Sequence, residues 1–291
     1  MRRFDDFYLS ALFLKNDFQI KLRKKRESIM EEKIWKKVER SLFEAETAAA
    51  CILQAGSMLM TNGAEVFRVE ETMTRMGYSI PGVKYCTAYV TVTGIMCSVE
   101  VAGQTVTRIA RIKNMDRNMT IVSAINALSR EAEIKHYSAE VLTKKLLSLN
   151  QLPNYSDSMK ALWGAIGAAG FAIFFGGGFI EIGFVFLIGL FIRLFTVMCS
   201  HVHVNAFFVN VLLSFCTAVL SVLFNRLVPS AQTSILIISS IMLLVPGLTI
   251  TNALRDSVMG EPLSSLVLLT QAMLVACAIA IGVLMGLAVV K

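Results

Sequence analysis

The chain has 291 residues, 55% of them hydrophobic, and a mean hydropathy of +0.62. These values exclude an ordinary soluble domain, whose composition is less apolar. The net charge of +7 does not indicate nucleic-acid binding, because no Lys/Arg stripe with interleaved aromatic residues occurs; basic cytoplasmic segments of a membrane protein account for it. The six cysteines lie far apart, which favours free thiols over a disulfide framework.

Most charged residues lie in the first 158 positions, so a polar first part is followed by an apolar second part. Residues 1–33 form a basic N-terminal extension that lacks the small-residue cleavage site of a secretory signal. Apolar residues then recur at helical spacing over residues 34–60, and Asn62-Gly63 predicts the end of this helix. The face that we expect to be buried comprises Ala48, Cys51, Ile52, Ala55, Met58 and Leu59.

Residues 34–152 predict an α+β domain with its own core. A second helix is expected over residues 64–76, with Thr72 on its polar face and with Val66, Val69, Met73 and Met76 as its buried stripe. After Pro81-Gly82 the period changes to two, which predicts antiparallel strands at residues 84–92, 95–101 and 105–112. Two more helices are expected at residues 120–130 and 138–150, the last with Ser138 as its N-cap.

After a polar linker at residues 153–158, the membrane part (residues 159–291) contains five apolar runs long enough to cross a ~30 Å hydrocarbon core. They cover residues 159–175, 180–199, 204–224, 234–254 and 263–290. The predicted fold class is therefore a cytoplasmic α+β domain followed by an all-α polytopic membrane domain of five transmembrane helices. Lys144, Lys145 and Lys160 favour a cytoplasmic N-terminal domain, and an odd number of spans places the C-terminus outside.

Several residues of the membrane part have expected packing roles. Two glycine groups, Gly164/Gly167/Gly170 and Gly282/Gly286, are expected to let helices approach closely. Glu181, which follows a glycine-rich bend, is expected to be exposed on the outer side. Arg193 lies well inside the second run, so it must snorkel, pair within the membrane or face a cavity.

A proline-glycine step interrupts the fourth apolar run. Pro246 has no backbone N–H and Gly247 is a poor helix former, so we expect the helix to break there. In hydrocarbon, the freed backbone groups survive only against protein or a water-filled cavity, and broken helices of this kind form transporter binding sites. The candidate substrate site comprises Pro246, Gly247, Thr249, Thr251, Asn252, Arg255 and Asp256.

Within this site, the positive end of the second half-helix, together with Asn252 and the threonine hydroxyls, would bind an anionic group. Arg255 would attract the substrate, and Asp256 would orient Arg255 or carry a proton. The alternative is a simple kink at a helix end, with Arg255 reaching the interface and pairing with Asp256.

Glu65, Arg68 and Glu70 are a candidate functional network of the cytoplasmic domain, although a solvated or interdomain ion-pair network explains them as well. No His, Ser or Cys lies close in sequence to suggest nucleophilic chemistry, so we expect no catalytic residue. Cys199, His201 and His203 diverge on a helix and lack a nearby carboxylate, so we expect no metal site and no cofactor.

Three stretches in this order resemble the threonine/serine exporter family: residues 62–72, with Gly63-Ala64-Glu65 and Arg68-Val69-Glu70; residues 174–178; and the Pro-Gly segment as far as Gly260. The chain is more similar to the split form of this family, the YjjP-like half of a two-component succinate exporter. The resemblance implies a cytoplasmic N-terminal domain, five membrane helices and a separate small membrane protein that completes the transport pathway.

We therefore expect a subunit of a secondary exporter that moves a small carboxylate, such as the dicarboxylate succinate, across the bacterial cytoplasmic (inner) membrane. The protein is then a transporter and not an enzyme. The alternatives are a threonine/serine exporter subunit, a membrane-anchored hydrolase and a regulatory subunit. The expected partners are the small membrane protein, the lipid bilayer and the substrate, and a homo-oligomeric arrangement within the complex is compatible with this interpretation.

Overall fold

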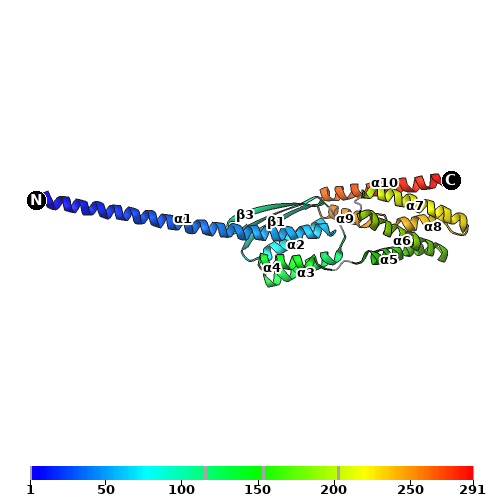
Figure 1. The fold of residues 1–291 in the computed structure, drawn as a ribbon, viewed down its shortest axis with the longest axis horizontal. Coiled ribbons are helices and arrows are strands. Elements are labelled where there is room, and N and C mark those ends of the chain that lie inside the picture. The colour runs from blue at the N-terminus through cyan, green and yellow to red at the C-terminus, as the bar shows by residue number, and fades with distance from the viewer. Residues whose placement is uncertain (1, 114–116, 153–154, 202–203, 291) are drawn as a thin grey trace. The chain divides into compact units, whose positions relative to one another are not determined.

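The computed structural model describes residues 2–113, 117–152, 155–201 and 204–290, with side chains described from Met30 onward except at residues 200–201. Within these ranges the chain is mostly helical and contains one small antiparallel sheet (Figure 1). It divides into two compact units. The first unit comprises residues 1–64 and 68–151, and the second comprises residues 65–67 and 152–291.

The first unit starts with a long helix that ends where the sequence predicts. Gly63 has a φ of 86°, which glycine adopts without strain, and the chain turns there into the second helix. At its other end the helix runs unbroken through position 33, where the basic extension was expected to end. The elements are α1 (Arg2–Thr61), α2 (Val66–Ser79), β1 (Val83–Thr91), β2 (Gly94–Val101), β3 (Gln104–Arg111), α3 (Met119–Lys135) and α4 (Ala139–Leu149).

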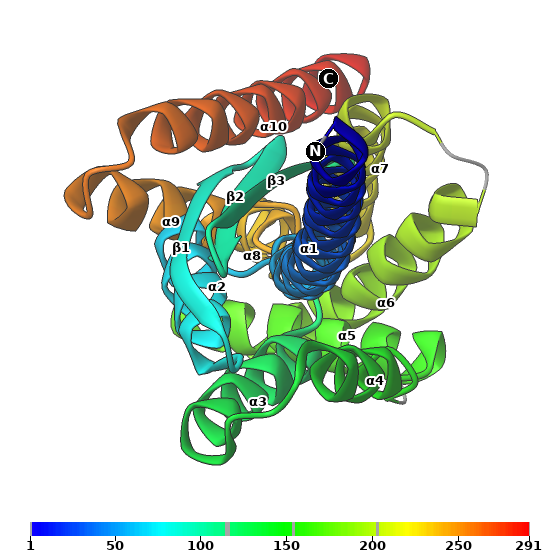
Figure 2. The same ribbon diagram turned by 90° about the vertical axis from the view of Figure 1, so that its left-hand side faces the viewer.

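The three strands form an antiparallel sheet in the order β1-β2-β3, as the alternating pattern predicts. On β2, Ile95, Cys97, Val99 and Val101 are buried and their neighbours are less so, which is the period of a strand with one face on a core. Helix α1 packs on the sheet (Figure 2), and the Cys97 thiol donates to the Ala49 carbonyl at 3.4 Å. The core of this unit therefore lies between α1 and the sheet.

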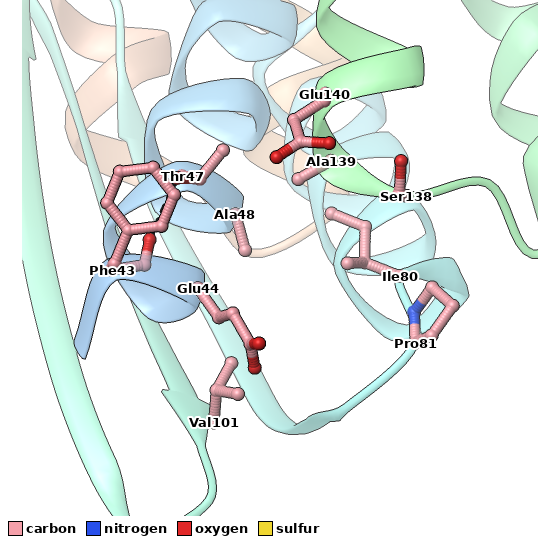
Figure 3. A pocket seen from close by; sticks show the side chains of 10 residues that line it. All are labelled: Phe43, Glu44, Thr47, Ala48, Ile80, Pro81, Val101, Ser138, Ala139 and Glu140. Atoms are coloured by element: carbon pink, nitrogen blue, oxygen red, sulfur yellow. Dashed lines mark hydrogen bonds between the residues drawn. The ribbon is translucent and has the colours of Figure 1, made fainter. Parts of the chain in front are cut away.

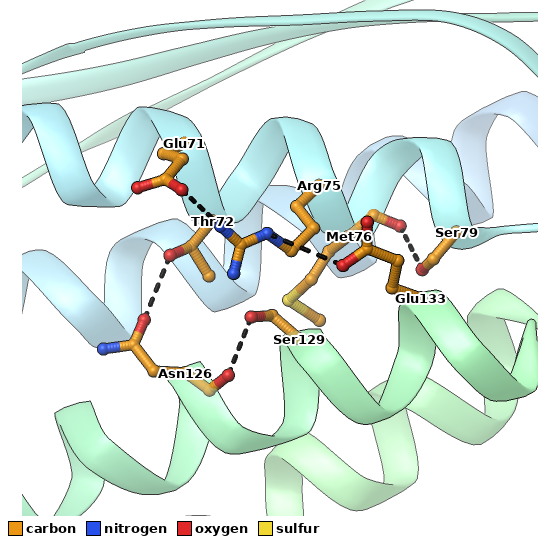
Figure 4. Close-up of polar contacts among 8 residues, drawn as sticks. All are labelled: Glu71, Thr72, Arg75, Met76, Ser79, Asn126, Ser129 and Glu133. Atoms are coloured by element: carbon orange, nitrogen blue, oxygen red, sulfur yellow. Dashed lines mark hydrogen bonds and ion pairs between the residues drawn. The ribbon is translucent and has the colours of Figure 1, made fainter.

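The helical repeats of α1 and α2 also predict their buried faces. All ten residues expected on these faces are buried, with exposed fractions of 0–7%. Thr72 is the exception on the other face: it was expected among polar residues, yet it is buried, because its hydroxyl donates to Asn126 Oδ1 of α3 at 3.1 Å (Figure 4). Ser138 is the N-cap of α4, as predicted, and accepts from the Val141 N–H.

The second unit contains α5 (Asp157–Phe174), α6 (Phe179–His201), α7 (Ala206–Leu227), α8 (Thr233–Ile241), α9 (Gly247–Val258) and α10 (Pro262–Val289). Among the described residues, three stretches are long and apolar enough to cross a membrane: Phe179–Cys199, Ala206–Leu227 and Pro262–Val289. The first predicted run corresponds to α5, and the fourth is divided between α8 and α9. Three of the five predicted spans are therefore single helices of sufficient length and hydropathy.

Helices α7 and α10 approach closely at the predicted glycines. A Cβ atom on Gly282 would lie 2.3 Å from the Val211 carbonyl oxygen, and one on Gly286 would lie 2.8 Å from that of Phe215. Both distances are well below the van der Waals contact distance, so no side chain fits at either glycine without movement of the backbone. Since the later glycine meets the later residue of α7, the two helices run parallel.

The glycines of α5 were expected to do the same, and for Gly167 and Gly170 this is wrong. A Cβ on either would have no described atom within 4 Å. Helix α5 instead packs on α6 through small residues on another face, where a Cβ on Gly189 would come 2.8 Å from that of Ala168. The alanines of this face are fully buried: Ala161, Ala165, Ala168 and Ala172.

Glu181 is buried, with an exposed fraction of 7%, and the expectation that it is exposed is wrong. Its Oε2 accepts from the Gly178 N–H at 3.0 Å, at the start of its own helix. Its Oε1 accepts from the Gln232 N–H at 3.1 Å, at the start of α8. The carboxylate therefore supplies the acceptors that two helix N-termini lack.

Replacing Gly282 with alanine is expected to destabilise the protein by about 1–3 kcal/mol, because the new methyl group overlaps the Val211 carbonyl and forces α7 and α10 apart. Gly167→Ala is the matched control: it adds the same methyl group in open space, and alanine is the better helix former. Thermal unfolding in detergent should show a loss for Gly282→Ala only. An equal loss in both variants would contradict the close contact.

Candidate functional site

The fourth apolar run is broken, as the sequence predicts, and the break begins one turn before Pro246. Helix α8 ends at Ile241, whose carbonyl accepts from the N–H groups of both Leu244 (2.8 Å) and Val245 (3.2 Å). Pro246 has φ −81° and ψ 54°, and the Gly247 N–H donates back to the Val245 carbonyl at 2.9 Å, which is an inverse γ-turn. Helix α9 then starts at Gly247.

Helix α9 presents the predicted site residues on two faces. Thr249, Asn252 and Asp256 follow the i, i+3, i+7 spacing of one face, and all three are at least partly buried. Thr251 and Arg255 lie four residues apart on a second, exposed face. The Thr251 hydroxyl donates to the Gly247 carbonyl at 3.0 Å, so its proton is already used within the helix.

Arg255 binds a carboxylate from a distant part of the sequence. Its Nη1 donates to Oε1 of Glu65, which belongs to the same compact unit. The Arg255 side chain is 47% exposed and that of Glu65 is 17% exposed. The sequence suggested Asp256 as the partner of Arg255, but adjacent residues on a helix point about 100° apart.

Asp256 is 1% exposed, and neither of its carboxyl oxygens has a hydrogen-bond partner among the described residues. Helix α9 packs on α10, where Ser264 and Ser265 are buried as well. The Ser264 hydroxyl likewise has no partner in the described ranges. These two serines are not among the site residues predicted from the sequence, and the packing of α9 on α10 adds them to this part of the unit.

The environment of Asp256 favours a neutral carboxyl. Burial raises the pKa of Asp256 to about 6, and the negative charges of Glu65 and Glu261 act in the same direction, whereas Arg255 lowers it. Helix α9 lies outside the three apolar spans. Since the folded state prefers the protonated form, the stability linked to Asp256 is largest below about pH 4 and is lost as the pH rises through about 6.

In the variant Asp256→Asn the new side chain is uncharged at every pH and has nearly the same shape, so the variant does not lose stability as the pH rises. We expect it to raise the unfolding temperature at about pH 7.5, by a stabilisation of up to about 3 kcal/mol, and to change it little near pH 4. Thermal unfolding in detergent at the two pH values measures the difference. An equal rise of the unfolding temperature at both pH values would show that the charge of Asp256 is not the cause.

The other candidate residues contact different partners. Glu70 Oε1 accepts from the Val90 N–H at 2.8 Å and so ties α2 to β1, while Glu65 contacts Arg255. Arg68 is exposed on α2. Farther along this helix, Arg75 pairs with Glu71 and lies 3.9 Å from Glu133 of α3 (Figure 4).

Arg193 of α6 lies against Gly164 of α5. A Cβ on Gly164 would come within 2.6 Å of Arg193 Cγ, so this glycine provides room for the arginine stem. The Arg193 side chain is half-buried. Gly164 therefore accommodates a polar side chain on the neighbouring helix.

The first unit has a cavity of about 290 Å³ that no sequence motif indicates (Figure 3). It lies between α1, the turn after α2, the end of β2 and the start of α4. Its buried floor is apolar, and Glu44 and Glu140 are its charged lining residues, so it does not suit an anion. The lining residues are Phe43, Glu44, Thr47, Ala48, Ile80, Pro81, Val101, Ser138, Ala139 and Glu140.

In the part of the chain that the structure describes, no three His, Cys, Asp or Glu side chains come close enough to hold a metal ion. His203, one of the three residues considered as ligands, lies outside the described residues, and the side chain of His201 is not described.

A family model described as "Putative threonine/serine exporter" matches residues 50–290, which include α2 to α10. The chain belongs to the threonine/serine exporter family. A protein of Klebsiella aerogenes named "Probable succinate transporter subunit YjjP" is 26% identical over 251 residues, which cover 84% of this chain and 94% of that protein. No solved structure matches the chain. The family and the three apolar helices together identify a membrane protein of a transporter family.

Proposed function

We propose that this protein is a subunit of a secondary exporter that moves a small carboxylate, such as the dicarboxylate succinate, out of the cell. Membership of an exporter family supports the proposal, as does the similarity to a protein named as a succinate transporter subunit. The observation that carries it is the carboxylate bound to Arg255 beside the broken helix.

Glu65 occupies the position that a substrate carboxylate would take. A guanidinium group binds carboxylates through charge-assisted hydrogen bonds, and Arg255 is exposed enough for a dissolved anion to replace Glu65. Asn252 lies three residues earlier on α9, about 4.5 Å along the helix axis and on a neighbouring face. Its amide is thus within reach of the second carboxylate of a short diacid bound at Arg255.

The membrane potential is sufficient to drive export of an anion. It contributes about 2.3 kcal/mol per charge per 100 mV, so a dianion that leaves a negative interior gains about 4.6 kcal/mol. A zwitterionic amino acid gains nothing from the potential and needs another source of energy. A dicarboxylate therefore fits the guanidinium of Arg255 and the available driving force better than threonine or serine.

The proposed topology has five spans in the bacterial cytoplasmic membrane, with residues 34–152 in the cytoplasm and the C-terminus outside. Helices α6, α7 and α10 supply three spans. Helix α5 has 18 residues and a length of about 27 Å, close to the ~30 Å hydrocarbon core. The broken fourth span consists of α8 and the part of α9 up to residue 254, so Arg255 and Asp256 lie beyond its end. A separate small membrane protein completes the pathway, as the word "subunit" in the relative's name suggests.

Efflux of labelled succinate and labelled threonine from preloaded vesicles tests the proposal, with the protein alone and with its co-expressed small partner. We expect partner-dependent efflux of succinate. Arg255→Ala should lower its rate about 10- to 100-fold, because a hydrogen bond to a charged group contributes about 1.5–3 kcal/mol. Glu65→Gln should lower the apparent KM, since it removes the carboxylate that competes for Arg255.

Arg226→Ala is the control for the loss of an arginine. Arg226 lies in the last turn of α7, and its guanidinium donates to the carbonyl of Val290 at the C-terminal end of α10. This is the end of α10 away from α9, so efflux should be unchanged. Efflux of threonine alone would favour the threonine/serine exporter alternative. No efflux from a folded complex would favour a regulatory subunit or a membrane-anchored hydrolase.

A further inference from the structure

We infer that Asp256 is a proton-binding group of the export cycle, and that a carboxylate bound at Arg255 holds the proton on Asp256. The inference rests on the proposed function for the identity of that carboxylate. The proton site itself rests on the geometry of α9 and α10.

The first argument is the burial of Asp256. An ionised carboxylate without partners is costly away from water, and such a group takes up a proton instead. Asp256 is 1% exposed, and within the described ranges neither oxygen accepts a hydrogen bond. Ala253 and Asp256 are the buried residues of α9, and α10 presents the buried Ser264 hydroxyl on the helix against which α9 packs. A hydroxyl can accept from a protonated carboxyl or donate to an ionised one.

The second argument is the set of charges that faces Asp256. Glu65 and Glu261 favour the protonated form, and Arg255 favours the ionised form. Arg255 is bound by Glu65, which offsets its positive charge. The proton occupancy of Asp256 therefore depends on what Arg255 binds.

Binding of a substrate carboxylate at Arg255 brings a further negative charge to this group of residues. The added charge favours protonated Asp256, so anion and proton bind with positive cooperativity, and each raises the affinity for the other by the same factor. A dicarboxylate then moves with one proton and one net negative charge, so the membrane potential drives this export half as strongly as that of the free dianion. When the anion leaves, Glu65 alone binds Arg255 and the group loses one negative charge, so the O–H bond of Asp256 breaks and the proton passes to water.

Infrared difference spectroscopy of the full-length protein with its partner tests the proton site, because a protonated carboxyl has a carbonyl band that an ionised one lacks. We expect a band that disappears with a midpoint near pH 6 and is missing in Asp256→Asn. Glu261→Gln is the matched control: it removes another carboxyl near this turn, keeps the band and lowers its midpoint. A band that persists in Asp256→Asn, or no band at about pH 5, would overturn the proton site.

Addition of succinate tests the coupling. We expect the midpoint to rise by about one pH unit, equally in sodium and in choline buffer. Succinate binding, measured by calorimetry, without this rise would overturn the coupling, and a rise only in sodium would assign the site to that ion instead. Absence of succinate binding would contradict both the proposed function and the coupling, whereas the band titration would still decide the proton site.

Discussion

Polar groups of the second unit that lie away from water must find partners within the protein, because apolar surroundings offer none. The Ile241 carbonyl accepts two N–H groups at the break, and Glu181 accepts two at the starts of α6 and α8. In the described structure five buried serine hydroxyls, that of Ser264 among them, and the carboxyl of Asp256 depart from this rule, and of these groups the carboxyl is the one that ionises. Departures of this kind occur at functional sites, where a group has to change its state.

Features that depend on local sequence were predictable. The alternation of Ile95, Cys97 and Val99 defines a strand, and the 3.6-residue repeat of α1 and α2 identifies their buried faces. The break near Pro246 follows from the chemistry of proline, which cannot donate a backbone hydrogen bond. The turn begins earlier, at Met242, because the last carbonyls of α8 are satisfied by tightened bonds before proline is reached.

Features that depend on contacts between distant residues were not predictable. Glu65 and Arg255 are 190 positions apart, and no spacing rule links them. Thr72 lies on a face that its own helix marks as polar, and only Asn126 of α3 makes its burial possible. Glycine spacing identified α5 as a close-packing helix, but the face in contact is set by Gly189 on α6 and not by Gly167 or Gly170.

The two hydrogen bonds of Glu181 restrict where this unit can bend. One carboxylate joins the first turn of α6 to the N-cap of α8, so these two helix starts are fixed to each other. The other end of α8 has no such tie among the residues that the structure describes, and the chain there is a turn and not a continuous helix. Residues 242–246 are therefore the place where the direction of the chain can differ between α8 and α9 without the loss of regular helical hydrogen bonds.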